Sequence, residues 1–287
     1  MNDTKLKVDF ARATGLLVIE IRNTNPNGNP DLDGDPRQRP DKKGEISPVS
    51  FKRKVRDLIE DKEGPAWKAL KEELKIKDEE FHILESRGRE REKIGKEIQE
   101  EKFEGKYWDA RVFGCTFLEK ETSCIKTGVV QFGLGISVAP IEISRHTNTN
   151  KAGVQEGKDR GMAPMGYRFV EHGVYCMPFF VNPSMAHKSG CTKRDIDVLL
   201  RVIPYAYSNT SSHARPMVEL RHAWYIEHRS PLGSCSDFKL IDALTPKKNT
   251  NPDKPSTCWE DYDPVPNDLP KDLKDKIASF RDLMNPE

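Results

Sequence analysis

The stretch TGLLVIEI, residues 14–21, decides the fold prediction because it is short, apolar and β-branched, which is typical of a buried strand. The stretch SPVSFKRKVRDLIE, residues 47–60, follows it and predicts a helix with Ser47 as N-cap and Pro48 at the first position. The apolar side chains of this helix share one face: Phe51, Val55, Leu58 and Ile59. The two stretches predict a strand followed by a helix that packs on it.

Four further stretches extend this pattern toward the C-terminus. Strands are predicted at residues 128–140 and 167–181, and a second amphipathic helix at residues 192–207. Residues 215–229 alternate as in a half-buried strand, with one face formed by Val218, Leu220, His222, Trp224 and Ile226. The order strand–helix–strand–strand–helix–strand predicts an α+β, modified ferredoxin-like or RRM-like fold (βαββαβ).

Two insertions interrupt this order. The first insertion spans residues 61–127, and its residues 66–104 are rich in Glu, Lys and Arg, which predicts exposed helix without a core. Residues 140–167 stand where a hairpin turn would be and lack an apolar pattern, which is typical of a binding loop or of disorder. We predict one domain at 1–244 that contains both insertions. A Pro-, Asp- and Lys-rich tail at 245–287 should follow, with a short helix around Leu273 to Met284.

The charge is unevenly distributed although the formal net charge is only +1. Residues 37–56 contain eight cations and two anions, a local charge of +6, whereas residues 259–287 have a local charge of −4. A polyanion is therefore expected to dock near the N-terminal third of the chain. The first residues show no secretory signal and no run approaches the ~20 apolar residues of a membrane span, so a cytoplasmic location is expected.

The loop RNTNPNGNPDLDGDPRQRP, residues 22–40, follows the first strand directly. Its composition favours tight turns, and its amides could face phosphate and sugar oxygens or could simply stabilise the loop. The helix after it offers cations about one turn apart, a spacing that suits nucleic-acid phosphates, although a solvated helix face remains open. The resulting candidates for RNA binding are Asn23, Asn25, Asn27, Arg37, Lys52, Arg53 and Arg56.

The insertion at 140–167 is the third candidate, either as a binding segment or as a mobile surface loop. It offers apolar wedges, Met162 and Met165, of the kind that can part stacked bases. Its positive charge comes from Arg145, His146, Lys151, Lys158, Arg160 and Arg168.

No catalytic, metal or cofactor motif is found. The histidines lack metal-ligand spacing, there is no nucleophile elbow or P-loop, and the aromatic RRM signature is missing. An EF-hand alignment that starts at Asn29 places Pro40 at the twelfth position, where calcium needs a bidentate Glu. We therefore expect no catalytic residue, no metal and no cofactor.

Several motifs in the same order resemble the Csd/Csh-type backbone subunit of the type I CRISPR Cascade complex, in the RAMP superfamily. They are NTNPNGNPD at 23–31, DPR at 35–37, FKRKVRD at 51–57, YWDARVFG at 107–114 and GVVQFGLGIS at 128–137. The resemblance implies an RRM-like palm with a web at 61–127 and a thumb at 140–167. Copies would assemble head to tail along CRISPR RNA and present it to target DNA.

The resemblance also implies roles for residues and partners. The RNA phosphates would be gripped around Asn25, Asn27, Lys52, Arg53 and Arg56, with Arg145 and His146 near the RNA and Met162 or Met165 at the thumb tip. Target DNA would meet Arg87, Arg89, Arg91, Lys151 and Lys158. Partners would be the repeat-handle-binding, large and small subunits, and indirectly the helicase–nuclease. Asn29 stands where the family pattern has an acidic residue, so subtypes C and B both stay open, with C preferred.

Two alternatives remain on sequence grounds. The first is an endoribonuclease of the same superfamily that processes CRISPR repeat RNA, with His146, Tyr167 or His172 for acid–base chemistry. The second is a metal-binding structural module built on the loop at 25–35.

Overall fold

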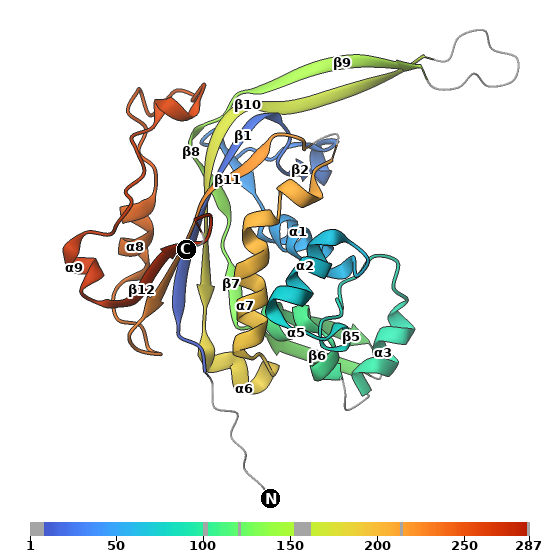
Figure 1. Ribbon diagram of the computed structural model, residues 1–287. Coiled ribbons are helices and arrows are strands. Elements are labelled where there is room, and N and C mark those ends of the chain that lie inside the picture. Colours follow the sequence, from blue (N-terminus) through green and yellow to red (C-terminus); the bar gives the residue numbers. More distant parts are fainter. Residues whose placement is uncertain (1–8, 100–102, 120–121, 152–161, 213–214, 286–287) are drawn as a thin grey trace, which may run out of the picture.

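A computed structural model describes residues 9–285 except 100–102, 120–121, 152–161 and 213–214. Its centre is an antiparallel sheet with the strand order β12-β11-β1-β10-β8-β4, in which β7 and β9 also pair with β10 (Figure 1). The strands are β1 (Ala13–Thr24), β4 (Lys43–Ile46), β7 (Val130–Phe132), β8 (Gly135–Pro140), β9 (Ile143–Lys151), β10 (Met162–Val181), β11 (Val218–His228) and β12 (Ile277–Asp282). The molecule thus has a mixed α/β fold around a central antiparallel sheet.

Helices cover one face of this sheet. They are α1 (Pro48–Glu60), α2 (Pro65–Leu74), α5 (Trp108–Phe113), α6 (Ala186–Ser189) and α7 (Lys193–Val202) (Figure 1). The side chain of Ser47 accepts a hydrogen bond from the Ser50 amide at 3.2 Å, so Ser47 caps α1 as predicted. The main core joins Leu17 and Ile19 of β1 to Phe51 and Val55 of α1. The first strand and the two amphipathic helices are therefore confirmed.

The C-terminal residues cover the opposite face, where a tail was expected. Helix α8 (Asp237–Leu244) and the short α9 (Lys271–Lys274) lie on this side, and β12 extends the edge of the sheet (Figure 1). A second core packs Leu16, Val18, Trp224 and Ile226 of the sheet against Leu240, Leu244, Tyr262, Leu269, Leu273 and Ile277. The short helix predicted around residues 273–284 is present only at its start, in α9, because Ile277–Asp282 pairs with β11 as an edge strand.

The prediction that β11 is half-buried is wrong for residues 223–226, which are buried on both faces of the strand, whereas Glu219 near its start is exposed. A register shift changes the alternation: Val18 pairs with His222, but the next residue, Ile19, pairs with Leu220. Arg221 is the extra residue of this bulge. Val218 and Leu220 therefore share the helical core with Ala223 and Tyr225, whereas Trp224 and Ile226 face the C-terminal segment.

The insertion at 61–127 contributes to the core, which the charged composition did not suggest. Eight of its side chains join the main core: Trp67, Leu70, Ile76, Phe81, Ile83, Trp108, Val112 and Phe113. The rest of the insertion contains α3 (Arg91–Gln99), α4 (Phe103–Lys106), β5 (Gly114–Glu119) and β6 (Thr122–Thr127). A separate small cluster, which includes Tyr107, Cys115 and Cys124, stabilises this part.

The insertion at 140–167 forms a β-ribbon in its described part. Residues 162–170 of β10 pair with β9, whereas residues 170–181 of the same strand pair with β1. The ribbon therefore projects beyond the end of β1, as Figure 1 shows at the upper right. The expectation of a loop is wrong for residues 143–151 and 162–167. No helix among the described residues is long and apolar enough to cross a membrane.

Candidate nucleic-acid interface

The loop after β1 is held by its own asparagines. It contains the short strands β2 (Gly28–Asn29) and β3 (Asp35–Pro36). The amide nitrogen of Asn25 donates to the Gly34 carbonyl at 2.8 Å. The amide oxygen of Asn27 accepts from the Ser47 amide at 2.7 Å, which ties the loop to the start of α1. Both side chains are buried, so the self-stabilising alternative describes them, whereas Asn23 is exposed.

Two of the three helix cations predicted to grip RNA are used inside the protein. Arg56 is only 4% exposed and pairs with the buried carboxylate of Asp109 at 2.9 Å, so its prediction as a phosphate contact is wrong. Arg53 pairs with Asp57 at 2.7 Å and also with Glu60. An arginine neutralised in this way offers little charge to a phosphate.

Lys52 is the cation of this group that forms no ion pair within the described part of the chain. Its ammonium lies 5.0 Å from the centre of the Phe113 ring. Burial lowers its pKa, and the neighbouring Arg56 lowers it further. The negative charge of a phosphate at Lys52 would offset both effects, so Lys52 stays a candidate for RNA binding.

The base of the β9–β10 ribbon is linked to the loop after β1. Asp35 of β3 binds Arg168 and lies 3.4 Å from the exposed Arg145. His146 is also exposed, and its ring contacts Phe169 edge-on at 5.0 Å between ring centres. Thus the structure brings the loop together with two basic residues of the ribbon, Arg145 and Arg168.

Other predicted residues can be placed only in part. Arg37 is 31% exposed and lies 3.7 Å from Glu45. Lys151 lies on β9 and Met162 and Met165 lie on β10, but their side chains fall outside the described residues. Lys158 lies outside the described chain altogether. Their assignment to a thumb or to DNA binding stays a prediction.

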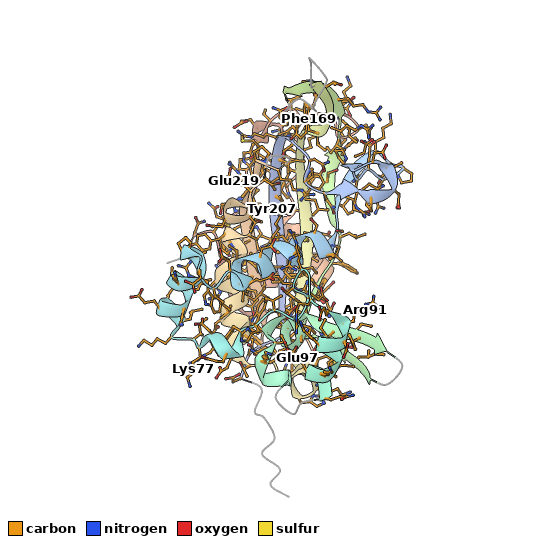
Figure 2. All side chains as sticks on the ribbon, turned by 90° about the vertical axis from the view of Figure 1, so that its right-hand side faces the viewer. Lys77, Arg91, Glu97, Phe169, Tyr207 and Glu219 are labelled. Carbon is orange, nitrogen blue, oxygen red and sulfur yellow. The ribbon has the colours of Figure 1, made fainter. Side chains whose placement is uncertain are left out.

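The three arginines predicted to bind DNA do not form one cluster, because each has different surroundings. Arg89 binds Glu97 and stacks on Tyr107, with 5.1 Å between its guanidinium carbon and the ring centre. Burial of Glu97 opposes its ionisation, but hydrogen bonds from Tyr107, Arg89 and Lys106 lower its pKa to about 2. Arg91 is exposed at the start of α3, far from Phe169 at the ribbon base (Figure 2). Arg87 is also exposed, but it faces a pocket.

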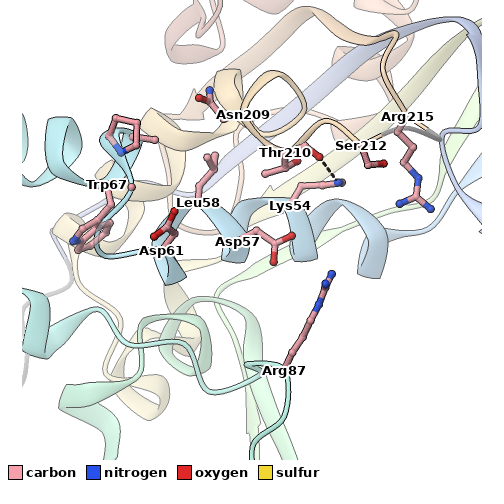
Figure 3. Close-up of a pocket in the computed structure, with 13 residues that line it drawn as sticks. Lys54, Asp57, Leu58, Asp61, Trp67, Arg87, Asn209, Thr210, Ser212 and Arg215 are labelled. Atoms are coloured by element: carbon pink, nitrogen blue, oxygen red, sulfur yellow. Dashed lines mark hydrogen bonds between the residues drawn. The ribbon is translucent and has the colours of Figure 1, made fainter. Parts of the chain in front are cut away.

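This pocket of about 480 Å³ lies between α1, the start of α2, residues 209–212 and Arg215 (Figure 3). Lys54 lines it and donates to the Thr210 carbonyl at 2.7 Å. Arg215 also lines it, and its Nε donates to the Asn25 carbonyl at 3.1 Å. Burial lowers the pKa of Lys54, and the nearby positive charges of Arg215 and Arg87 add to this effect.

Sequence reasoning missed the pocket. Lys54 belongs to the basic run of α1, but it lies two positions after Lys52 and therefore points to a different side of the helix. No local signal points to Arg215, because it reaches α1 only through the strand order of the sheet.

The three residues suggested for a nuclease do not form one cleft. His172 is 3% exposed, and its ring nitrogens lie 2.8 Å from the Ser256 hydroxyl and 3.3 Å from the carboxylate of the buried Glu20. His146 is exposed on the ribbon, where it pairs with Tyr167 across the two strands. Among the described residues there is no group of three or more His, Cys, Asp or Glu side chains that could hold a metal ion.

Comparisons with known proteins show which family the sequence matches and which solved structures have a similar fold. Residues 11–266 match the family model of CRISPR-associated protein Cas7. The fold is similar to a chain of a "CRISPR RNA-guided surveillance complex, pre-nicking", with 14% identity and a TM-score of 0.50 over 76% of this chain and 77% of that one.

Two further solved structures are similar at a lower level. A chain of a "CRISPR RNA-guided surveillance complex" has 15% identity and a TM-score of 0.45, over 83% of this chain and 77% of that one. A chain of the "Type III-B Cmr-beta bound to cognate target RNA" has 12% identity and a TM-score of 0.39, over 76% and 61%. No curated protein matches the sequence.

Proposed function

Because the chain belongs to the Cas7 family of CRISPR-associated proteins, we propose that it is a guide-RNA-binding backbone subunit of a type I Cascade complex, of subtype C. Several copies would assemble head to tail along the spacer of the CRISPR RNA and present it to target DNA in antiviral defence. The family match over residues 11–266 is the observation that supports this proposal, because it includes the loop after β1, α1 and the β9–β10 ribbon.

The arrangement of elements supports an RRM-like palm. Along the chain, β1, α1, the β7–β8 pair, β10, α7 and β11 follow the order βαββαβ. The insertion at 61–127 would then be the web, and the ribbon around 140–167 the thumb. The C-terminal segment covers the sheet face that an RRM uses for base stacking, so RNA would bind along the palm edge instead.

Exposed and half-buried polar groups near the loop after β1 suggest the path of the RNA. Arg145 and His146 at the ribbon base, Asn23 at the end of β1 and Lys52 on α1 would contact its phosphates and sugars. Such contacts follow backbone geometry without reading the bases, which fits a coat that must accept any guide sequence. Met162 or Met165 would reach between bases at the thumb, and Arg91, Lys151 and Lys158 would meet target DNA.

This role is structural and needs no catalytic group or cofactor. The partners would be CRISPR RNA, further copies of the chain, target DNA and the repeat-handle-binding, large and small subunits, with the helicase–nuclease recruited indirectly. The endoribonuclease alternative is less well supported, since His172 is buried beneath the C-terminal segment.

Co-expression with a CRISPR array tests the proposal. The protein should purify as a large particle with RNA whose nuclease-protected fragments form a ladder of regular increment. A monomer free of nucleic acid that cuts repeat RNA would refute the proposal and establish the endoribonuclease.

A further inference from the structure

We propose that the pocket between α1, residues 209–212 and Arg215 holds one phosphodiester of the guide RNA through Lys54, Arg87 and Arg215. The inference rests on the proposed function and adds to it a phosphate site that lies apart from the ribbon base. The three cations come from α1, from the insertion at 61–127 and from the segment before β11. The site therefore exists only in the folded chain.

The charge balance of the pocket favours an anion. Within the described part of the chain, none of these three cations forms an ion pair with a carboxylate. The carboxylate of Asp57, which also lines the pocket, is bound by Arg53 at 2.7 Å. Three positive charges that raise each other's energy in a half-buried site are stabilised when a phosphate arrives.

Two of the three cations, Lys54 and Arg215, are held in place but keep free hydrogen-bond donors. Lys54 uses one of its three N–H donors on the Thr210 carbonyl at 2.7 Å. Arg215 uses Nε on the Asn25 carbonyl at 3.1 Å, which leaves its two terminal nitrogens for a ligand. Figure 3 shows the ends of Lys54, Arg87 and Arg215 gathered at one end of the pocket. Such fixed donors match the oxygens of a phosphodiester.

The acidic end of the pocket limits the path that an RNA strand can take. Asp61 lies there beside Leu58 and Trp67, away from Arg215 (Figure 3). A polyanion is repelled at this end, so the strand should pass the cationic end.

Two features favour RNA over DNA as the source of the phosphate. Arg215 binds the backbone of Asn25, in the loop proposed to contact the guide, so one strand can follow both sites. In addition, the exposed amide of Asn209 and hydroxyl of Ser212 line the pocket and can hydrogen-bond a 2′-hydroxyl, which DNA lacks.

Binding of a labelled single-stranded RNA by the purified full chain tests the site. Lys54→Met, Arg87→Gln and Arg215→Gln should each weaken binding roughly tenfold, as expected for the loss of a charge-assisted hydrogen bond. The triple variant should also lower the slope of log affinity against log salt by about 0.7, the value for one phosphate of a single strand. Arg87→Gln is the safest variant for folding, because its side chain is exposed.

Lys68→Met on α2 is the matched control. Lys68 is 59% exposed, pairs with Glu63 and does not line the pocket, so its removal should leave affinity and slope unchanged. Melting temperatures of all variants show whether each one folds.

The outcomes separate the two proposals. A wild-type chain that binds no RNA refutes the proposed function itself. A wild-type chain that binds RNA, with folded pocket variants of unchanged affinity and slope, overturns the pocket site alone. Pocket variants that lose binding to DNA of the same sequence but keep RNA binding would assign the pocket to DNA and likewise overturn the inference.

Discussion

Replacing Arg56 by Met should destabilise the protein without removing an RNA contact. Arg56 is 4% exposed and Asp109 is 1% exposed, and their ion pair measures 2.9 Å. Removing one partner of a buried ion pair costs about 3–5 kcal/mol, because the remaining charge stays buried without its counterion. The pair with Glu85 adds little, since that side chain is 57% exposed.

The loss of unfolding free energy in Arg56→Met should lie near the lower end of this range. Asp109 keeps hydrogen bonds from the amides of Leu84 and Glu85 at 2.7 and 3.1 Å, which still stabilise its carboxylate. About 3 kcal/mol corresponds to a melting temperature lower by roughly 6 °C for a chain of this size.

Lys52→Met is the matched control on the same helix. Lys52 lies over the same Phe113 ring one turn earlier and forms no ion pair within the described residues. We expect its melting temperature to stay within about 2 °C of the wild type. Calorimetry measures the stability, and RNA titration at low temperature, where both variants are folded, measures binding. If Arg56→Met kept its melting temperature but lost RNA affinity, the structural role of Arg56 would be refuted.

Four further predictions concern RNA binding, the ribbon, pH and the second core. Lys52→Met should weaken RNA binding and lower the salt slope by about 0.7 in the same titration, and an unchanged slope would remove Lys52 from the interface. Deleting residues 148–162 should leave the melting temperature of the sheet nearly unchanged but abolish the regular increment of guide protection; a chain that fails to fold would show that the ribbon is part of the core. Burial lowers the pKa of His172 below its usual 6.5. Below about pH 6.5 the unfolded chain therefore binds a proton that the folded chain does not, so the stability of the folded chain decreases as the pH decreases. Urea midpoints between about pH 7 and pH 5.5 should therefore drop less in His172→Gln than in the wild type, and equal drops would contradict this. Leu240→Ala should cost about 2–5 kcal/mol in unfolding free energy, whereas Phe238→Ala, at a side chain 75% exposed on the same helix, should cost little; equal losses would argue against the second core.

The sequence determined the elements that local patterns encode. The apolar run at 14–21, the Ser47 cap with the apolar stripe of α1 and the amphipathic helix α7 all follow from residues that are close along the chain. The link between the Asn-rich loop, the basic helix and RNA was also a sequence prediction, because composition alone places cations beside a turn-forming segment.

The tertiary structure decided which of those residues are accessible to a ligand and which are buried or paired inside the protein. Arg56 and Lys52 are equivalent cations in the sequence, yet Arg56 is paired with the buried Asp109 from the inserted segment, whereas Lys52 has no ion pair among the residues that the structure describes. The bulge at Arg221 and the covered second face of the sheet depend on pairing with β1 and on packing of α8, which no local pattern encodes. The pocket likewise needs Lys54, Arg87 and Arg215 from three distant segments. Periodicity records how a residue is oriented on its own element, whereas burial and charge pairing depend on which other elements the fold brings against it.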